Sequence, residues 1–173
     1  MNLRVAKEKD LNFIIEMITI VKKHMIENDN DQWDEEYPDM ETLRRDIINE
    51  DLYTIIEGNN CMAIIAINKD QAPEYKNVQW KLDDKSPLVV HRLAVNPKFQ
   101  GKGLAKIIMS FVDEKAKEQN CKSIRLDTYS KNKVAINLYE RLGYSIVGEV
   151  YFRGKELPFK CFEKIVENKV SIE

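Results

Sequence analysis

The sequence predicts an α+β (α/β mixed) fold that forms one domain over residues 1–173. A chain of 173 residues is long enough to bury a core of its own and falls within the usual size of one domain. Segments with apolar residues at helical spacing alternate along the chain with short, β-branched apolar runs. No repeat, low-complexity segment or linker divides it. We therefore expect helices and strands to share a single core.

The first half of the chain contains both kinds of pattern. Asn2–Ala6 is a short edge strand, and Leu11–Ile26 is an amphipathic helix with apolar side chains every three or four residues. A second short helix is expected at Met40–Asn49. Two strands follow at Leu52–Glu57 and Cys61–Asn68, joined by a three-residue hairpin loop at Gly58-Asn59-Asn60.

The second half begins with a polar excursion at Lys69–Ser86. Leu88–Val95 is apolar and β-branched, as a central strand should be. Gly103–Gln119 is a helix, with one apolar face made of Leu104, Ile107, Ile108, Phe111 and Val112. The remaining elements are a strand at Ser123–Thr128, a helix at Lys133–Leu142 that ends before Gly143, and strands at Tyr144–Tyr151 and Pro158–Val166.

The composition excludes several classes of protein. Hydrophobic residues make up 43% and charged residues 32%, which is typical of a soluble globular chain. The net charge of −2 argues against a globally basic protein, so we expect no nucleic-acid partner. No apolar run reaches 18 residues, and the N-terminus lacks the apolar core of a signal peptide. We therefore predict a cytoplasmic protein without a membrane partner.

The charges divide unevenly along the chain. Residues 27–41 hold eight acidic side chains and no basic one, whereas residues 96–133 hold nine basic and four acidic side chains. An anionic ligand should favour the basic segment.

The three cysteines, at positions 61, 121 and 161, are odd in number and widely spaced. Only His24 and His91 could join them as metal ligands, so we expect buried free thiols, no disulfide framework and no metal.

A candidate anion site lies where the central strand leads into the long helix. Gln100-Gly101-Lys102-Gly103 joins the two elements, and Lys98 and Lys106 flank it. A helix N-terminus presents unpaired amides and the positive end of the helix dipole, and glycines let a bulky anion approach the backbone. The segment matches neither a Walker A loop nor a dinucleotide fingerprint. The alternative is a tight turn that binds nothing.

In this segment and in a second one, the chain resembles the GCN5-related N-acetyltransferases (GNAT family). Gln100-Gly101-Lys102-Gly103-Leu104-Ala105 is similar to the family's Gln/Arg-x-x-Gly-x-Gly/Ala signature, and it follows Leu93-Ala94-Val95-Asn96-Pro97. The run from Asn132 to Tyr144 resembles the family's Asn-x-x-Ala-x-x-x-Tyr-x-x-x-Gly-Phe/Tyr segment. The resemblance covers roughly residues 88–151.

The resemblance implies a fold and a cofactor. The fold would be a mixed, mostly antiparallel sheet of about seven strands flanked by helices, with strands four and five parallel and splayed apart. Acetyl-CoA would lie in the splay as the acetyl donor. Its pyrophosphate would bind amides of Gln100, Gly101, Lys102, Gly103, Leu104 and Ala105, with Lys106 nearby, and its pantetheine would pair with the Leu93-Ala94-Val95 backbone and contact Asn132.

The resemblance also implies roles in catalysis. Tyr139 matches the tyrosine that faces the CoA sulfur, which makes it the candidate general acid, and the Val95 amide would bind the oxyanion. The alternative for Tyr139 is a packing side chain. His91 lies on the same strand as Leu93 and Val95, and strand alternation places all three side chains on one face, so it is a candidate base. A histidine with a purely structural role is equally compatible, and Glu57 is a weaker rival.

The acceptor is the least defined part of the site. Trp33 lies in the acidic segment, where aromatic and acidic side chains together suit a cationic amine. The alternative is a solvated loop with Trp33 anchored in the core. We expect direct acetyl transfer to the primary amine of a small molecule. A protein N-terminus or lysine as acceptor, and a non-catalytic CoA-binding module, stay open as alternatives. The oligomeric state stays open as well, with a homodimer as one alternative.

Overall fold

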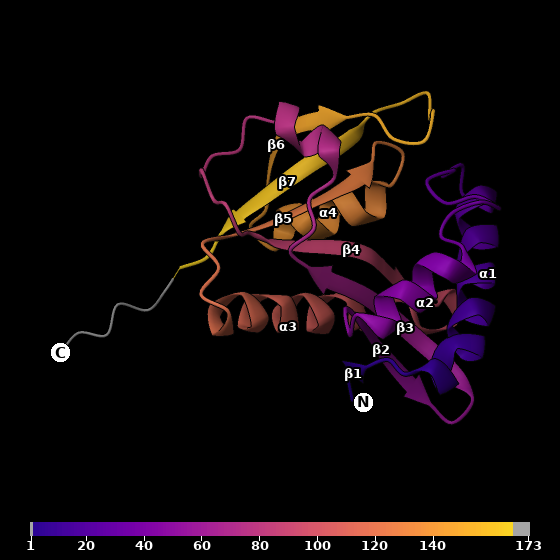
Figure 1. Cartoon of the computed structure of the whole chain (residues 1–173). Coiled ribbons are helices and arrows are strands. Elements are labelled where there is room, and N and C mark those ends of the chain that lie inside the picture. Colours follow the sequence, from indigo (N-terminus) through magenta and orange to yellow (C-terminus); the bar gives the residue numbers. More distant parts are fainter. Residues whose placement is uncertain (1, 168–173) are drawn as a thin grey trace. The chain divides into compact units, whose positions relative to one another are not determined.

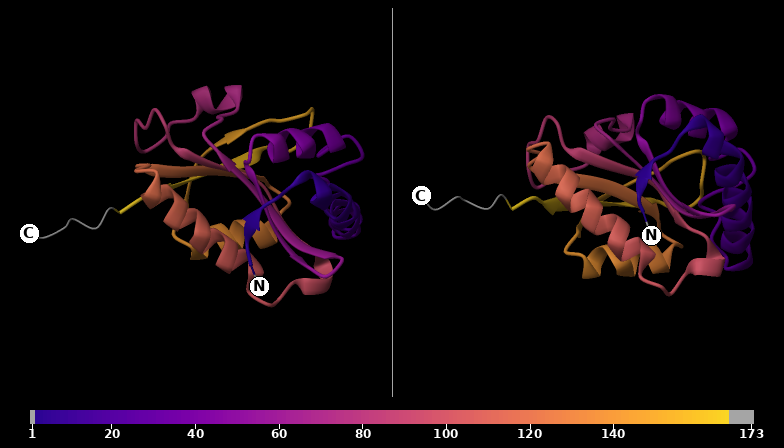
Figure 2. Two further views of the ribbon diagram at one scale, coloured as in Figure 1. Left: turned by 60° about the horizontal axis from the view of Figure 1, so that its bottom comes forward. Right: turned by 90° about the horizontal axis from the view of Figure 1, so that it is seen from below.

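The computed structural model describes residues 2–167 and has the predicted α+β fold (Figures 1 and 2). Its sheet is mixed and seven-stranded, in the order β1-β2-β3-β4-β5-β7-β6, and helices flank it. Strand β4 (Leu88–Val95) pairs in parallel with β5 (Ser123–Tyr129), through Leu88 with Ile124 and Val89 with Arg125. The pairs β1–β2, β2–β3, β5–β7 and β6–β7 are antiparallel.

Two compact units share this chain. The first comprises Met1–Asn68 and Val90–Ile108, and the second comprises Lys69–Val89 and Met109–Glu173. Both β4 and α3 (Leu104–Glu118) begin in one unit and end in the other. The predicted single domain over residues 1–173 stays a prediction.

The first unit is built on the β2–β3 hairpin. Besides part of β4, its elements are β1 (Arg4–Val5), α1 (Leu11–Glu27), α2 (Met40–Ile48), β2 (Leu52–Glu57) and β3 (Asn60–Asn68). Figure 2 shows α1 and α2 beside the hairpin. Ile14 and Met17 of α1, Leu43 of α2 and Ile64 of β3 are almost fully buried in one apolar cluster. The predicted apolar stripe of the first helix is thus its buried face.

The second unit is built on an antiparallel ribbon. Its strands are β5, β6 (Ser145–Val150) and β7 (Phe159–Ile165), its helices are α4 (Lys133–Arg141) and most of α3, and a 3-10 helix spans Pro73–Asn77. Figure 1 shows β5, β7 and β6 side by side. The polar excursion is fastened to this ribbon by Arg125, which donates to Gln71 at 2.8 Å and to the Leu82 carbonyl at 2.7 Å.

Three details differ from the sequence prediction. The hairpin loop has two residues, because Asn60 pairs with Glu57 and belongs to β3. The edge strand is only Arg4–Val5. On α3, Ile107 is 50% exposed although its spacing fits the apolar face. Gly143 does follow α4, with a φ of 86° that favours glycine.

The Arg4–Asp10 pair should make stability depend on pH. Asp10 is buried and accepts hydrogen bonds from the Arg4 guanidinium at 2.7 and 2.9 Å, and these hold the pKa of Asp10 below its usual value. A carboxyl whose pKa is lower in the folded state stabilises the fold above its unfolded pKa, about 3.9, and loses this contribution as pH falls.

We therefore expect Asp10→Asn to be less stable than wild type at pH 6 and to show a shallower loss of stability down to pH 3. Urea unfolding at several pH values measures this. Asp83→Asn, at an exposed carboxylate, is the control and should follow wild type. An unchanged slope in Asp10→Asn would contradict the assignment.

Candidate functional site

The candidate anion loop is built from the exit of β4. Asn96 is buried, and its side chain donates to the Cys61 carbonyl at 3.1 Å and accepts from the Lys98 amide at 3.1 Å. A short 3-10 turn follows at Pro97–Phe99. These contacts fix where the chain leaves the sheet, so the glycine segment starts from a rigid point.

The two glycines of the loop adopt a conformation that other residues avoid. Gly101 has a φ of 77° and Gly103 a φ of 75°. A Cβ added at either position would meet no atom within 4 Å. The glycines are thus needed for backbone conformation rather than for tight packing, and the space beside the backbone is open.

The loop is exposed where it leads into α3. Residues 100–103 are exposed. Within the part of the chain that the structure describes, the amides of Gly101, Lys102 and Gly103 donate to no protein oxygen. Lys98, Lys102 and Lys106 are exposed as well, and the Lys102 ammonium lies 5.2 Å from the centre of the Phe99 ring. Unpaired amides, a helix N-terminus and lysines are the donors that a pyrophosphate requires.

Strand β4 is not regular where the cofactor backbone contacts were predicted. Arg92 has a φ of 51°, which is unusual for a residue with a side chain. A left-handed residue interrupts the alternation of a strand. The regular alternation that would place His91 and Leu93 on one face therefore does not continue through Arg92. Ala94 is buried, whereas Leu93 and Val95 are half-buried.

A buried ion pair holds Arg92 in this conformation. Its guanidinium makes two hydrogen bonds to the Asp46 carboxylate of α2, at 2.7 and 2.9 Å, and a third to the Tyr37 hydroxyl at 3.0 Å. The side chains of Arg92 and Asp46 are 9% and 4% exposed. Burial raises the pKa of Asp46, and the guanidinium opposes that rise. The network ties the irregular part of β4 to α2 and to the acidic segment.

His91 belongs to a second polar chain in the first unit. Its Nε2 lies 2.8 Å from Asn68 Oδ1, and the Asn68 amide nitrogen donates to Asp51 at 3.1 Å. Because the Asn68 oxygen can only accept, His91 Nε2 is assigned as the donor. In the neutral ring, Nδ1 then carries the lone pair that a base needs.

The other predicted residues of the first unit differ in exposure. Trp33 is 3% exposed and packs in the apolar cluster of α1 and α2, so its ring offers little surface to a ligand. This favours the alternative in which Trp33 anchors the acidic loop. Glu57 is exposed at the end of β2, beside the two-residue turn.

In the second unit, Tyr139 and Asn132 both belong to α4. Tyr139 is 5% exposed, and its ring packs edge-on against Phe162, with centroids 5.5 Å apart. Burial raises the pKa of Tyr139 far above its usual value, and the Asp127 charge adds to this, so the phenol stays protonated. Asn132 caps the helix, since its side-chain oxygen accepts from the Ala135 amide at 3.2 Å.

Asp127 is a polar residue that the sequence reasoning missed. It lies on β5, is half-buried, and accepts a hydrogen bond from the Tyr75 hydroxyl at 2.6 Å. The only signal in the sequence is a carboxylate in the middle of a predicted strand, between Leu126 and Thr128.

The three cysteines differ in their surroundings, and the Lys69 ammonium contacts the Cys121 sulfur. All three are free and buried. Burial raises the pKa of the Cys61 thiol to about 11 and that of Cys161 to about 12, so neither is a ready nucleophile. Within residues 2–167, no group of three or more His, Cys, Asp or Glu side chains is placed to hold a metal ion. Over the same residues, no helix has the length and apolar character to cross a membrane.

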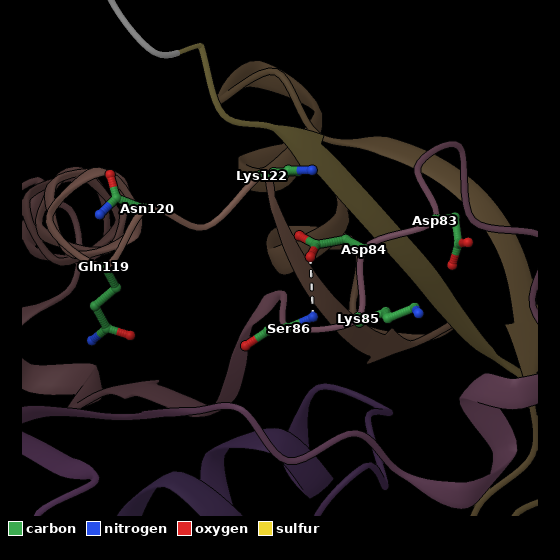
Figure 3. A pocket seen from close by; sticks show the side chains of 7 residues that line it. All are labelled: Asp83, Asp84, Lys85, Ser86, Gln119, Asn120 and Lys122. Atoms are coloured by element: carbon green, nitrogen blue, oxygen red, sulfur yellow. Dashed lines mark hydrogen bonds between the residues drawn. The ribbon is translucent and has the colours of Figure 1, made fainter.

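A polar pocket of about 400 Å³ opens elsewhere on the second unit (Figure 3). It is lined by Asp83, Asp84, Lys85, Ser86, Gln119, Asn120 and Lys122. Figure 3 shows the Asp84 carboxylate turned back to the Ser86 amide, 3.0 Å away. None of the predicted site residues lines this pocket.

Comparison with known proteins places the chain among the acyltransferases. The family model described as "Acetyltransferase (GNAT) family" matches residues 17–144. The chain belongs to the acetyltransferase (GNAT) family.

Individual relatives agree with this. A GNAT-family acetyltransferase from Streptococcus agalactiae 2603 superposes with a TM-score of 0.84 at 25% identity, over 96% of each chain. The fold also matches yncA from Salmonella typhimurium, solved with its cofactor acetyl-CoA, with a TM-score of 0.70 at 16% identity over 100% of this chain and 98% of that one. A spermine/spermidine N(1)-acetyltransferase of Bacillus subtilis (strain 168) is 33% identical over 90 residues, 51% of this chain. The match spans 56% of that relative.

Proposed function

We propose that this protein transfers the acetyl group of acetyl-CoA to a primary amine of a small molecule. The observation that carries the proposal is the loop at the start of α3. Gly101 and Gly103 have positive φ and are exposed, and the exposed Lys98, Lys102 and Lys106 lie within or beside the loop in sequence. This is an anion site of the kind that the pyrophosphate of acetyl-CoA requires. Family membership supplies the acyl donor.

The residues present fit acetyl-CoA in the following way. Amides from Gln100 to Ala105 bind the pyrophosphate, with Lys106 beside them. The backbone of Leu93, Ala94 and Val95 pairs with the pantetheine arm, and the family resemblance assigns Asn132 a contact with the same arm. Acetyl-CoA supplies the activated acyl group, and every other step falls to the protein.

The protein must then transfer two protons and stabilise the negative charge that develops on the thioester oxygen. A base removes a proton from the acceptor ammonium; His91 through Nδ1 is the first candidate, and Glu57 is the second. The Val95 amide stabilises the oxyanion. Tyr139, kept protonated by burial, donates to the leaving thiolate. The raised thiol pKa values of Cys61 and Cys161 favour direct attack in a ternary complex over an acetyl-cysteine intermediate.

The proposed class of acceptor, a cationic amine, follows from the charge of the acidic segment. The eight acidic residues of segment 27–41 favour a cationic acceptor. The Bacillus subtilis relative, which is named for spermine and spermidine, agrees with this class. Spermidine is therefore the first amine to test, against peptides with a free N-terminus or a lysine. Acetylation of the peptides alone would contradict the small-molecule proposal. Acetyl-CoA binding without turnover of any acceptor would favour a non-catalytic module.

The Tyr139→Phe variant tests the acid role. We expect kcat to fall about 100-fold and the Kd for acetyl-CoA to stay within about twofold, because the hydroxyl acts on the leaving group rather than on binding. Steady-state rates and calorimetry measure the two quantities.

Tyr144→Phe is the matched control. The Tyr144 ring lies 5.9 Å from that of Tyr139, and its hydroxyl is buried with no hydrogen-bond partner among the described residues. This variant should keep the wild-type kcat. Equal rates for Tyr139→Phe and wild type would remove Tyr139 from the mechanism.

A further inference from the structure

Asp127 occupies a defined face of β5. In the β5–β7 ladder, Asp127 pairs with Cys161 and Leu126 pairs with Phe162. Successive side chains of a strand point to opposite faces. Asp127 and Cys161 therefore lie on one face of the ribbon, and Leu126 and Phe162 lie on the other.

Each face is covered by a tyrosine from a different part of the second unit. Tyr139 of α4 packs against Phe162 and so covers the Leu126 face. Tyr75 of the 69–86 excursion donates to Asp127 at 2.6 Å and covers the opposite face. Phe162 pairs with Leu126, the strand neighbour of Asp127, so the Tyr139 ring and the Asp127 carboxylate lie at adjacent positions of the ladder. Tyr139 and Tyr75 thus cover β5 from opposite sides.

The contact between Tyr75 and Asp127 is rigid. Tyr75 is 3% exposed, and its ring lies 5.0 Å from that of Trp80. The Trp80 indole nitrogen donates to the Tyr75 carbonyl at 3.0 Å. Burial keeps the pKa of Tyr75 well above its usual value, so its hydroxyl remains a donor. One carboxylate oxygen, Oδ2, is therefore held in a fixed orientation, and the side chain stays half-buried.

We propose that Asp127, oriented by Tyr75, binds the ammonium group of the acceptor amine on the face of β5 opposite Tyr139. An ammonium has three donors and suits a carboxylate that already has one oriented oxygen. In direct transfer, a base first removes one proton from the bound ammonium, and the neutral amine then attacks the thioester carbon. The carbon–sulfur bond breaks as Tyr139 protonates the leaving sulfur. The Asp127 carboxylate on one face would bind the nitrogen of the acceptor. The Tyr139 phenol on the other face would donate to the leaving sulfur. This proposal rests on the proposed function and adds an acceptor-binding residue to it.

The test uses the whole chain with saturating acetyl-CoA and varied spermidine. For Asp127→Asn, which keeps the shape of the side chain, we expect the KM for spermidine to rise at least tenfold, while the Kd for acetyl-CoA changes less than about twofold. A structural role alone would not separate these two constants. Asp83→Asn removes an exposed carboxylate of the same unit and should leave both unchanged.

Tyr75→Phe provides a second variant should Asp127→Asn fold poorly. It keeps the carboxylate but removes the bond that orients it, so the KM for spermidine should rise two- to fivefold, with the Kd for acetyl-CoA unchanged. Wild-type KM values in both variants would overturn the proposal.

The Asp127 site can be tested even if the proposed acetyl transfer to a small amine fails. If wild type acetylates no amine, calorimetry of propylammonium binding to the acetyl-CoA complex decides the question. Binding that Asp127→Asn abolishes supports the Asp127 site without catalysis. Absent binding, or binding that Asp127→Asn leaves unchanged, overturns it.

Discussion

Gly103→Asp is expected to weaken acetyl-CoA binding by about a hundredfold or more. Two effects act in the same direction. A residue with a side chain at φ 75° costs about 1–2 kcal/mol, so the loop shifts away from the conformation that aims its amides. The new carboxylate would also stand beside the bound pyrophosphate, where like charges repel. Calorimetry with acetyl-CoA and with CoA measures the loss.

Gly154→Asp is the matched control for this experiment. Gly154 also has a positive φ, 65°, and an added Cβ there would meet nothing within 4 Å. It lies outside the anion loop, so the variant carries the same backbone cost and the same added charge without affecting the site. We expect its affinity for acetyl-CoA to equal that of wild type. Equal affinity in Gly103→Asp would refute the anion site.

Arg92→Ala should be the most destabilising of the substitutions considered. It leaves the Asp46 carboxylate buried without its two charged hydrogen bonds, a loss of about 3–5 kcal/mol in the free energy of unfolding. Asp46→Ala should cost a similar amount, because it strands the guanidinium. The double variant should cost clearly less than the sum, since it leaves neither charge unpaired. Urea unfolding of the four proteins measures the cycle, and strict additivity would contradict the pairing.

Arg92→Gly separates the backbone from the ion pair. A glycine accepts the φ of 51° without strain, so the glycine variant should be about 1 kcal/mol more stable than the alanine variant, although both lack the pair. At a regular strand position the order would be reversed, because glycine is the weaker strand former. Unfolding curves that rank alanine above glycine would therefore contradict the irregular geometry of β4.

Local pattern was sufficient to predict most of the fold. The bounds of α1, α2 and β4 follow from apolar spacing and from turn residues next to them. The two glycines also indicated the turn at positions 101 and 103, because glycine adopts a positive φ readily.

Features that depend on distant partners could not be predicted in this way. In the sequence, nothing distinguishes Arg92 from the other residues of its strand. Its left-handed backbone is explained by its hydrogen bonds to Asp46, which lies 46 positions away. The same holds for Asp127, whose partner Tyr75 comes from a polar excursion without a regular pattern. Trp33 in the acidic segment was compatible with a ligand surface and with an anchor in the core, and its neighbours in sequence could not decide between them, whereas its burial does.

The most direct test of the central proposal is a thiol-release assay with acetyl-CoA, in which spermidine and other small primary amines are compared with peptides. We expect CoA release that depends on the small amine, with mass spectrometry detecting one added acetyl group per CoA released. The rate pattern should be that of a ternary complex. Acetyl-CoA binding without release for any amine, or an acetylated enzyme that forms before the amine is added, would contradict direct acetyl transfer to a small amine.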